Sequence, residues 1–327
     1  MDATVQKRTR NSRWSRDPVI DRSGAPAVIY LTARDIEIFK LLVRFRYLTS
    51  DYIHAFIGGS EKALSRRLNL LCRKPNLYLA RPHQQRQSAD ANHRHLVYQL
   101  DERGSRTLRE RGLSFLPRSY HHNFAHEFMV GQVTASIELG ARENTDIRLI
   151  TWSEILTRET TPIATREAAS PATVRVSYTL RGAARSDDIT ADAQPFGLER
   201  TIDGARSYLF FPGIEADCAS EPIDARDAAR SSIAKKFAAY TAIAEQGLHR
   251  RHFGFPNFFV PFITTTAARL RSMMELLDRN TKGRGSKILL FKVFPSFASA
   301  EKSPPATGHV LTEPWQRVGF PPLCLDR

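Results

Sequence analysis

The stretch 192–240 constrains the fold of this chain most. An apolar run, Tyr208–Asp217, ends in two acids at alternate positions, and a helical pattern begins at Ser231. Alternate residues of a strand point to the same face, so we expect Glu215 and Asp217 to lie side by side. A strand that leads into a helix is typical of an α/β sheet.

The remainder of the second half supports the same fold class. Its pattern predicts strands at 147–152, 189–196, 208–217, 258–263 and 288–293, and helices at 123–142, 231–245 and 267–277. A polar excursion rich in Ser, Thr and Ala runs to about residue 186. Strands that alternate with helices predict an α/β domain over 119–300, with the sheet covered on both faces. Residues 301–327 are expected to form a C-terminal extension whose Trp315 packs back on this domain.

Residues 29–118 predict a winged helix-turn-helix domain. Thr32, with an acid three residues later, is a good N-cap for a first helix. A second helix is expected to end at Gly58-Gly59, and a third covers 60–73. Two β-like runs, 77–80 and 95–100, follow, and the polar loop 82–93 between them would form the wing.

Positive charge is concentrated in the front of the chain. The formal net charge is +14, and residues 1–120 hold 23 Lys and Arg against 11 Asp and Glu, whereas residues 121–327 hold 25 against 23. This asymmetry indicates a polyanion partner, and double-stranded DNA fits a basic helix better than a membrane surface does. A solvated basic face of a protein-interaction domain is the other interpretation. The candidate DNA contacts on the third helix are Lys62, Arg66, Arg67, Asn69 and Arg73.

Residues 1–28 are polar and basic, and we expect a disordered arm. The three cysteines form no Cys-x-x-Cys pair, which favours a reducing compartment. The N-terminus has no apolar core for a secretory signal, and no apolar run is long enough to span a membrane. These features predict a cytoplasmic protein.

Three acids could bind one metal ion. If Asp192 meets Glu215 and Asp217, their oxygens suit Mg²⁺ or Mn²⁺, which bind carboxylates, water and substrate phosphate. Acids near strand ends are more often solvated turn residues, so both interpretations stay open. Glu127 is a candidate additional carboxylate. His122 and His126 have a spacing that allows a shared metal, although a satisfied polar cluster fits them better.

Several motifs resemble those of the replication-relaxation family, which includes relaxases of the mobilisation C class related to restriction endonucleases. Leu31–Ile36 is similar to the opening helix signature of the family. Ile214–Pro222 resembles its Glu-x-Asp motif followed by Ser/Thr-Glu-Pro, and Lys236–Tyr240 resembles its Lys-apolar-x-x-Tyr helix. With Glu313–Trp315, the similarity spans about 30–316.

This resemblance implies a winged-helix DNA-binding domain joined to a nuclease-like α/β core of the PD-(D/E)xK kind. It also implies a role in mobilisation or replication of a plasmid or integrative element. The chain departs from the pattern because Ala191 replaces a Pro, and Asp217 stands where restriction enzymes have Lys. Lys236, or less favourably Lys235, could supply the ammonium group that the restriction-enzyme lysine would have provided.

The sequence thus predicts a relaxase-like DNA-nicking protein with Asp192, Glu215, Asp217 and Lys236 in the catalytic site. Glu221 and Tyr240 are candidate supporting residues. A covalent intermediate on Tyr240 is conceivable, but core packing of its ring is favoured. The expected partners are an origin-like DNA site and mobilisation or replication proteins, and homodimerisation stays open. The alternative is a non-catalytic winged-helix replication or transcription regulator with a degenerate nuclease-like domain.

Overall fold

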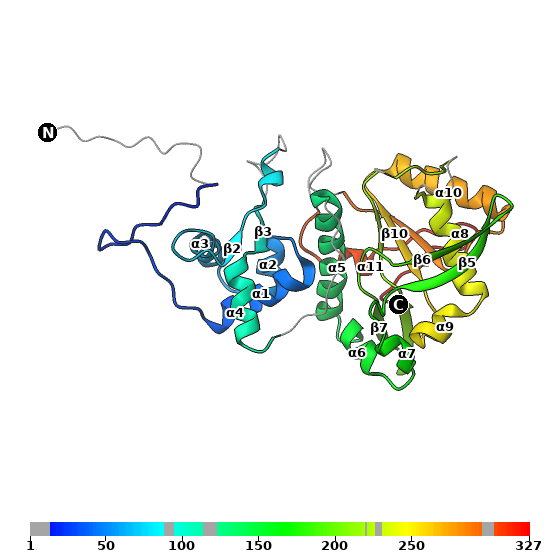
Figure 1. The fold of residues 1–327 in the computed structure, drawn as a ribbon, viewed down its shortest axis with the longest axis horizontal. Helices are drawn as coiled ribbons and strands as arrows, with labels where there is room; N and C mark the ends of the chain where they lie inside the picture. Colours follow the sequence, from blue (N-terminus) through cyan, green and yellow to red (C-terminus); the bar gives the residue numbers. More distant parts are fainter. Residues whose placement is uncertain (1–13, 88–94, 114–122, 220, 226–230, 296–303) are drawn as a thin grey trace. The chain divides into compact units, whose positions relative to one another are not determined.

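The structure, a computed structural model, describes residues 14–87, 95–113, 123–219, 221–225, 231–295 and 304–327 (Figure 1). The chain divides into two compact units, residues 1–117 and residues 118–327, here called unit 1 and unit 2. Helices and small sheets occur in both, so the class is mixed α/β. Within the described ranges, we find no helix with the length and apolarity needed to cross a membrane.

Unit 1 combines helices with a small antiparallel sheet. Strand β3 lies in the middle of this sheet and pairs with β1 and with β2. The expected helices are confirmed, and so are the two β-like runs, although most of the loop between them (88–94) lies outside the described residues. The elements are α1 (Ala33–Phe45), β1 (Leu48–Thr49), α2 (Ser50–Ile57), α3 (Glu61–Leu71), β2 (Leu79–Ala80), the 3-10 helix η1 (His83–Gln87), β3 (Val97–Leu100) and α4 (Glu102–Glu110).

Local signals explain why these helices begin where they do. Thr32 and Asp35 form a capping box at the start of α1, and Ser60 caps α3. Three leucines at helical spacing on α3 are buried, namely Leu64, Leu68 and Leu71. Apolar residues at helical spacing therefore set how α3 packs.

Part of the arm expected to be disordered has defined contacts with unit 1. Residues 1–13 lie outside the described residues. Further along, the backbone N–H of Lys74 donates to the Arg16 carbonyl, and Asn76 bonds the backbone at Ala27 and Ile29. The segment 14–30 thus contacts the turn that comes after α3.

Unit 2 is built around a parallel sheet in the order β11-β10-β9. Its helices are α5 (Phe124–Glu143), α6 (Trp152–Thr157), α7 (Ile163–Arg166), α8 (Ile233–Glu245), α9 (Leu248–Phe253), α10 (Ala267–Thr281) and α11 (His309–Thr312). Its strands are β4 (Ile147–Ile150), β5 (Val174–Leu180), β6 (Ala183–Ile189), β7 (Phe196–Ile202), β8 (Ala205–Phe211), β9 (Glu215–Asp217), β10 (Val260–Thr264) and β11 (Leu289–Val293).

The parallel sheet has an apolar core on each face. Phe262 of β10 packs with α8 and α10 on one side, whereas the next residue, Ile263, packs with α5 on the other. Figure 1 shows the sheet between these helices. Period-2 alternation produces this division, so the expectation of a sheet covered on both faces is confirmed for these strands. Trp315 is buried on the α5 side, as expected.

Two of the other strand predictions for unit 2 are wrong, whereas the strand predicted at 147–152 is present as β4. The polar excursion contains a hairpin of two seven-residue strands, β5 and β6, and a second antiparallel sheet has the order β4-β7-β8. Within the predicted strand 189–196, residues 190–195 form a loop between β6 and β7, and this loop carries Asp192. The predicted strand 208–217 is interrupted at Pro212-Gly213, so β8 and β9 belong to different sheets, since Pro and Gly disfavour a strand interior.

Candidate functional site

A close backbone approach brings Asp192 beside β9. Gly213 has φ +141, and a Cβ atom there would lie 2.2 Å from the Ala193 carbonyl oxygen, so only glycine lets the loop approach this far. The backbone N–H of Asp192 donates to the Ile214 carbonyl at 2.9 Å, and the Ala216 N–H donates to Asp192 Oδ2 at 2.8 Å. The Asp192 carboxylate therefore lies next to the strand that carries Glu215.

Asp192 also contacts a histidine from α5. His126 Nε2 lies 3.1 Å from Asp192 Oδ2, and the two side chains are 14% and 8% exposed. Burial alone would raise the pKa of Asp192, but the hydrogen bond from His126 and the charge of Lys236 outweigh it, so this pKa is lowered. For His126, burial alone would lower the pKa, but the hydrogen bond and charge of Asp192 outweigh burial, so the pKa of His126 is raised. The pair therefore favours a carboxylate beside an imidazolium.

Glu215 lies between an ammonium and a phenol. Lys236 Nζ is 2.8 Å from Glu215 Oε2, and the Tyr240 hydroxyl donates to Glu215 Oε1. Lys236 and Tyr240 are four residues apart on α8, so they reach the strand from one helix face. Burial, with the charge of Asp192 adding to it, raises the pKa of Glu215 to about 7. Two neighbouring buried carboxylates thus share the positive charge of Lys236.

Lys236 has a second carboxylate partner. Glu221 Oε2 lies 3.2 Å from Lys236 Nζ, and the Ser231 hydroxyl donates to the other oxygen of Glu221. Burial would lower the pKa of Lys236, but Glu215, Asp192 and Glu221 raise it well above its ordinary value. The ammonium is therefore retained in a site where its side chain is only 23% exposed.

Asp217 has a different cation as its partner. The guanidinium of Arg269, in the first turn of α10, donates from Nε to Asp217 Oδ2 at 2.7 Å and from Nη2 to Oδ1 at 3.2 Å. Thr264 and the backbone N–H of Ala219 also donate to this carboxylate. Asp217 is thus half of a buried ion pair, and the hypothesis that it shares a metal ion with Asp192 and Glu215 stays a prediction.

The described residues contain no group of three or more His, Cys, Asp or Glu side chains placed to hold a metal ion. Glu127 is buried on α5 and its charge acts on His126. Asp192 and Glu215 are the predicted ligands that do come together. Carboxylate oxygens are ligands that a hard cation accepts, and Mg²⁺ needs only one or two protein carboxylates beside water and phosphate.

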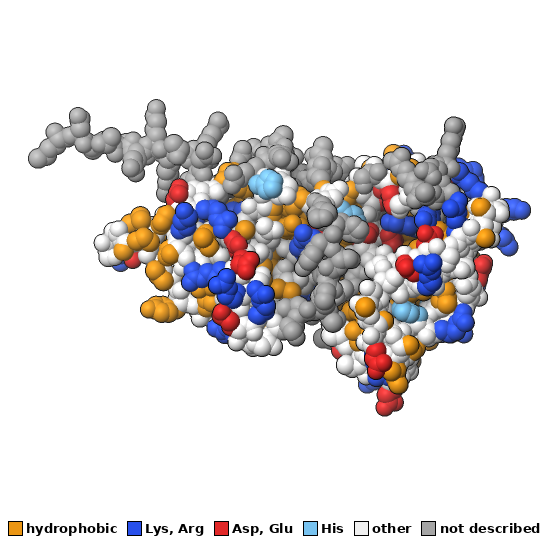
Figure 2. All heavy atoms as spheres, in the orientation of Figure 1, with side chains coloured by type: hydrophobic (Ala, Val, Ile, Leu, Met, Phe, Trp, Pro, Cys, Tyr) orange, Lys and Arg blue, Asp and Glu red, His pale blue; other side chains and the backbone are white. Residues whose placement is uncertain are grey.

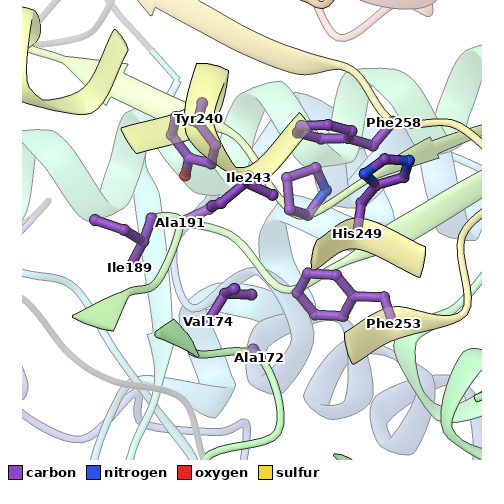
Figure 3. A pocket seen from close by; sticks show the side chains of 10 residues that line it. Ala172, Val174, Ile189, Ala191, Tyr240, Ile243, His249, Phe253 and Phe258 are labelled. Atoms are coloured by element: carbon purple, nitrogen blue, oxygen red, sulfur yellow. The ribbon is translucent and has the colours of Figure 1, made fainter. Parts of the chain in front are cut away.

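Tyr240 faces away from solvent. It is 1% exposed, and its ring borders a cavity of about 10 Å³ whose wall includes His249, Phe253 and Phe258 (Figure 3). That volume admits about one water molecule and no substrate. Burial and the charge of Glu215 raise the pKa of Tyr240 well above its ordinary value. A covalent role for this phenol is therefore not supported in this conformation.

The DNA-contact candidates of α3 fall into different environments. Lys62 and Arg66 are exposed. Arg67 instead donates from Nε and Nη2 to the buried Asp35 at 2.9 and 2.6 Å, and from Nη2 to the Tyr30 carbonyl. Asn69 bonds to Arg73. Arg67 thus links α3 to α1 rather than pointing to a ligand.

Sequence reasoning missed the partners of two acids. Nothing singled out Arg269, although an acid in the place of a lysine requires a cation nearby. The parallel register pairs Asp217 with Thr264, and α10 begins three residues after Thr264. His126 was grouped with neighbouring histidines as a polar cluster, of which His121 and His122 lie outside the described residues. The position of His126 in the first turn of a helix did not indicate that this residue contacts Asp192.

Comparison with protein-family models identifies the family of this chain. A family described as replication-relaxation matches residues 39–257, which cover more than half of the chain and include the Asp192, Glu215 and Lys236 cluster. Neither a curated protein nor a solved structure matches the chain.

Proposed function

Because this chain belongs to the replication-relaxation family, we propose that it binds double-stranded DNA during replication or mobilisation of a genetic element and nicks it with a divalent metal ion. The site proposed for nicking is Asp192, Glu215 and Lys236. The observation that carries the proposal is the Lys236 ammonium, 2.8 Å from Glu215 and electrostatically coupled to Asp192. Lys236, on α8, would thereby supply the positive charge that restriction enzymes have as a lysine at the place of Asp217.

Unit 1 supplies the DNA-binding part of the proposal. A tight Gly58-Gly59 turn separates α2 from α3, and an antiparallel strand pair follows, which supports a winged helix-turn-helix. In that fold α3 would enter the major groove. The exposed Lys62 and Arg66 would then contact phosphates or base edges.

Unit 2 supplies the chemistry through a core of the PD-(D/E)xK kind. Asp192 and Glu215 would hold Mg²⁺ or Mn²⁺, which when bound lowers the pKa of a coordinated water and offsets charge on the phosphate. Lys236 would stabilise the negative charge that develops on the phosphate, in a partly dry site where such stabilisation is strong. His126 would hold Asp192 in place, and Glu221 would hold Lys236.

Incubation with supercoiled plasmid carrying a cognate origin-like site, in the presence of Mn²⁺, tests the proposal. We expect the parent to convert supercoiled to open-circular DNA and Asp192→Ala and Glu215→Ala to lose this activity. Glu275→Ala, which removes an exposed acid of α10, is the matched control and should nick normally. Parental nicking activity in both Asp192→Ala and Glu215→Ala would contradict the proposed site.

A non-catalytic regulator is the second candidate, and one observation favours it. Asp192, Glu215 and Asp217 each have a protein cation as partner: His126, Lys236 and Arg269. A degenerate nuclease core could use such pairs to hold its fold. Absence of metal-dependent nicking on a DNA that the parent binds tightly would favour this function.

A further inference from the structure

A groove in unit 1 lies between the first two turns of α3 and the start of β3. Its volume is about 270 Å³, and the residues that line it are Ser50, Glu61, Leu64, Ser65, His95, Leu96 and Tyr98. The Ser50 backbone N–H donates to the Leu96 carbonyl at 2.9 Å, and the Ser50 hydroxyl lies 3.4 Å from His95 Nδ1. The groove combines buried apolar residues with a few polar side chains, which is typical of ligand sites.

Glu61 is an acid on a helix that also presents cations. It is the first residue of α3, it is exposed, and the exposed Lys62 and Arg66 follow it. A carboxylate that approaches DNA is repelled by the phosphates. An acid in the first turn also stabilises a helix through the macrodipole, but that effect requires neither the groove nor DNA. The position of Glu61 beside the groove is what distinguishes it from an ordinary first-turn acid.

We propose that this α3–β3 groove receives the edge of a cytosine in the major groove of duplex DNA, and that Glu61 accepts a hydrogen bond from the exocyclic amine. The inference rests on the proposed DNA binding by unit 1 and deepens it. The N-terminal residues of a recognition helix are those that contact base edges, and Glu61 begins α3. Lys and Arg side chains gather over unit 1 (Figure 2), and they offset the repulsion between this carboxylate and the phosphates.

The chemistry of a carboxylate selects cytosine among the four bases. An ionised glutamate only accepts hydrogen bonds. In the major groove, guanine presents two acceptors and thymine presents one acceptor and a methyl group, so neither offers a donor to Glu61. Adenine presents a donor beside the N7 acceptor, whose lone pair opposes a carboxylate, whereas cytosine presents its amine alone. The Ser50 and Ser65 hydroxyls, which donate or accept, can contact the guanine of the same base pair.

Selection of binding sites from a randomised duplex pool tests this inference with the full chain. We expect the parent to enrich sites with one position at which cytosine is required. Glu61→Gln presents a donor and an acceptor, the pattern that reads adenine, so the preference at that position should change from cytosine to adenine. Glu61→Ala should accept any base there and keep the parental preference at the other positions.

Fluorescence anisotropy on defined duplexes adds a change of opposite sign. On the selected duplex, Glu61→Ala should bind about 5- to 150-fold more weakly than the parent, the range for loss of one good base contact. On an unrelated duplex it should bind more tightly, because a negative charge near the phosphates has been removed. Glu110→Ala, which removes an exposed acid at the end of α4, is the matched control and should keep the base preference of the parent.

The outcomes separate this inference from the function on which it rests. If the parent binds no duplex, the proposed DNA binding fails, and the base contact fails with it. If the parent binds and both Glu61 variants select the parental sites, only the base contact is refuted. Thermal unfolding of each variant shows whether it is folded. A lower Tm for Glu61→Ala with an unchanged base preference would assign Glu61 to the stability of α3 alone and overturn the inference.

Discussion

Unit 1 and unit 2 hold their cationic side chains in different ways. On α3 of unit 1, Lys62 and Arg66 are exposed, although Arg67 pairs with the buried Asp35. In unit 2, Lys236 touches two carboxylates and is 23% exposed, and Arg269 is paired with Asp217 and 17% exposed. Exposed charge attracts a polyanion over a distance, whereas buried, paired charge acts only on groups in contact with it. The exposed charges of α3 can thus attract an anion from a distance, whereas the paired charges of unit 2 act on the groups that they contact.

Disrupting the Asp217–Arg269 pair should produce the largest change in stability. Arg269→Gln leaves a carboxylate that is 3% exposed without its guanidinium, and loss of one partner of a buried pair costs about 3–5 kcal/mol. We expect a fall of that size in the free energy of unfolding, measured by urea denaturation. Arg271→Gln, an exposed position in the same helix, is the control and should change little.

A double-mutant cycle sharpens this prediction. Asp217→Asn with Arg269→Gln removes both charges, so the pair of changes should cost less than the sum of the single changes. If Arg269→Gln is no more damaging than Arg271→Gln, the pair contributes nothing to the fold. Asp217 would then again be a candidate metal ligand.

Removal of the Lys236 ammonium should affect chemistry and leave binding unchanged. Loss of a group that stabilises transition-state charge typically costs about 10²–10³ in rate, so Lys236→Met should lower nicking by that factor while the dissociation constant for duplex DNA stays the same. Lys235→Met is the matched control, because Lys235 pairs with Asp187 of the hairpin at 3.0 Å. Equal losses in both variants would contradict the division between the units.

The buried pair of unit 1 predicts a pH-dependent effect of intermediate size. Burial raises the pKa of Asp35, but hydrogen bonds from Arg67 and Thr32 outweigh it, so the pKa lies below its ordinary value of 3.8. A lowered folded-state pKa contributes stability that is complete above 3.8 and lost as the pH falls through the folded-state value. Asp35→Asn should therefore destabilise the protein by about 1.5–3 kcal/mol at pH 7, the range for hydrogen bonds to a charged group.

Titration of stability checks the sign of this effect. The difference between the parent and Asp35→Asn, followed by thermal unfolding, should shrink as the pH falls below 3.8. A difference that grows towards acid pH would show that Asp35 is not held as a carboxylate. Glu37→Gln, an exposed acid in the same helix, should show no such trend.

The parts of the fold that depend on local signals could be predicted from the sequence. Caps at Thr32 and Ser60 and apolar spacing located the helices of unit 1 correctly. The hairpin β5–β6 was missed because its Ser, Thr and Ala content suggests a loop, although Val174, Val176 and Tyr178 alternate with polar residues as in a strand. The break at Pro212-Gly213 was also readable, since neither residue suits a strand interior.

The site was predictable only in part, because its partners lie far apart in sequence. Adjacency of Lys236 and Tyr240 to Glu215 follows from a strand–helix unit and was expected. The pairing of Asp217 with Arg269 spans 52 residues and depends on the register of β9 with β10. No local pattern encodes that register. Likewise, no local pattern reveals the ion pair of Arg67, because a projection of the helix places this residue on the surface expected to face a ligand.

The smallest expected effect concerns a single exposed charge in each unit. Arg66→Gln on α3 should lower the salt slope of duplex binding by about 0.9, the contribution of one phosphate contact. Arg175→Gln on β5 removes an arginine that lies 3.1 Å from Asp188, and a charge already offset by a carboxylate releases no counterion. Its slope should equal that of the parent. An equal reduction of the salt slope in both variants would mean that ion pairing does not decide which unit attracts DNA. An unchanged slope for Arg66→Gln would mean that α3 does not face the duplex.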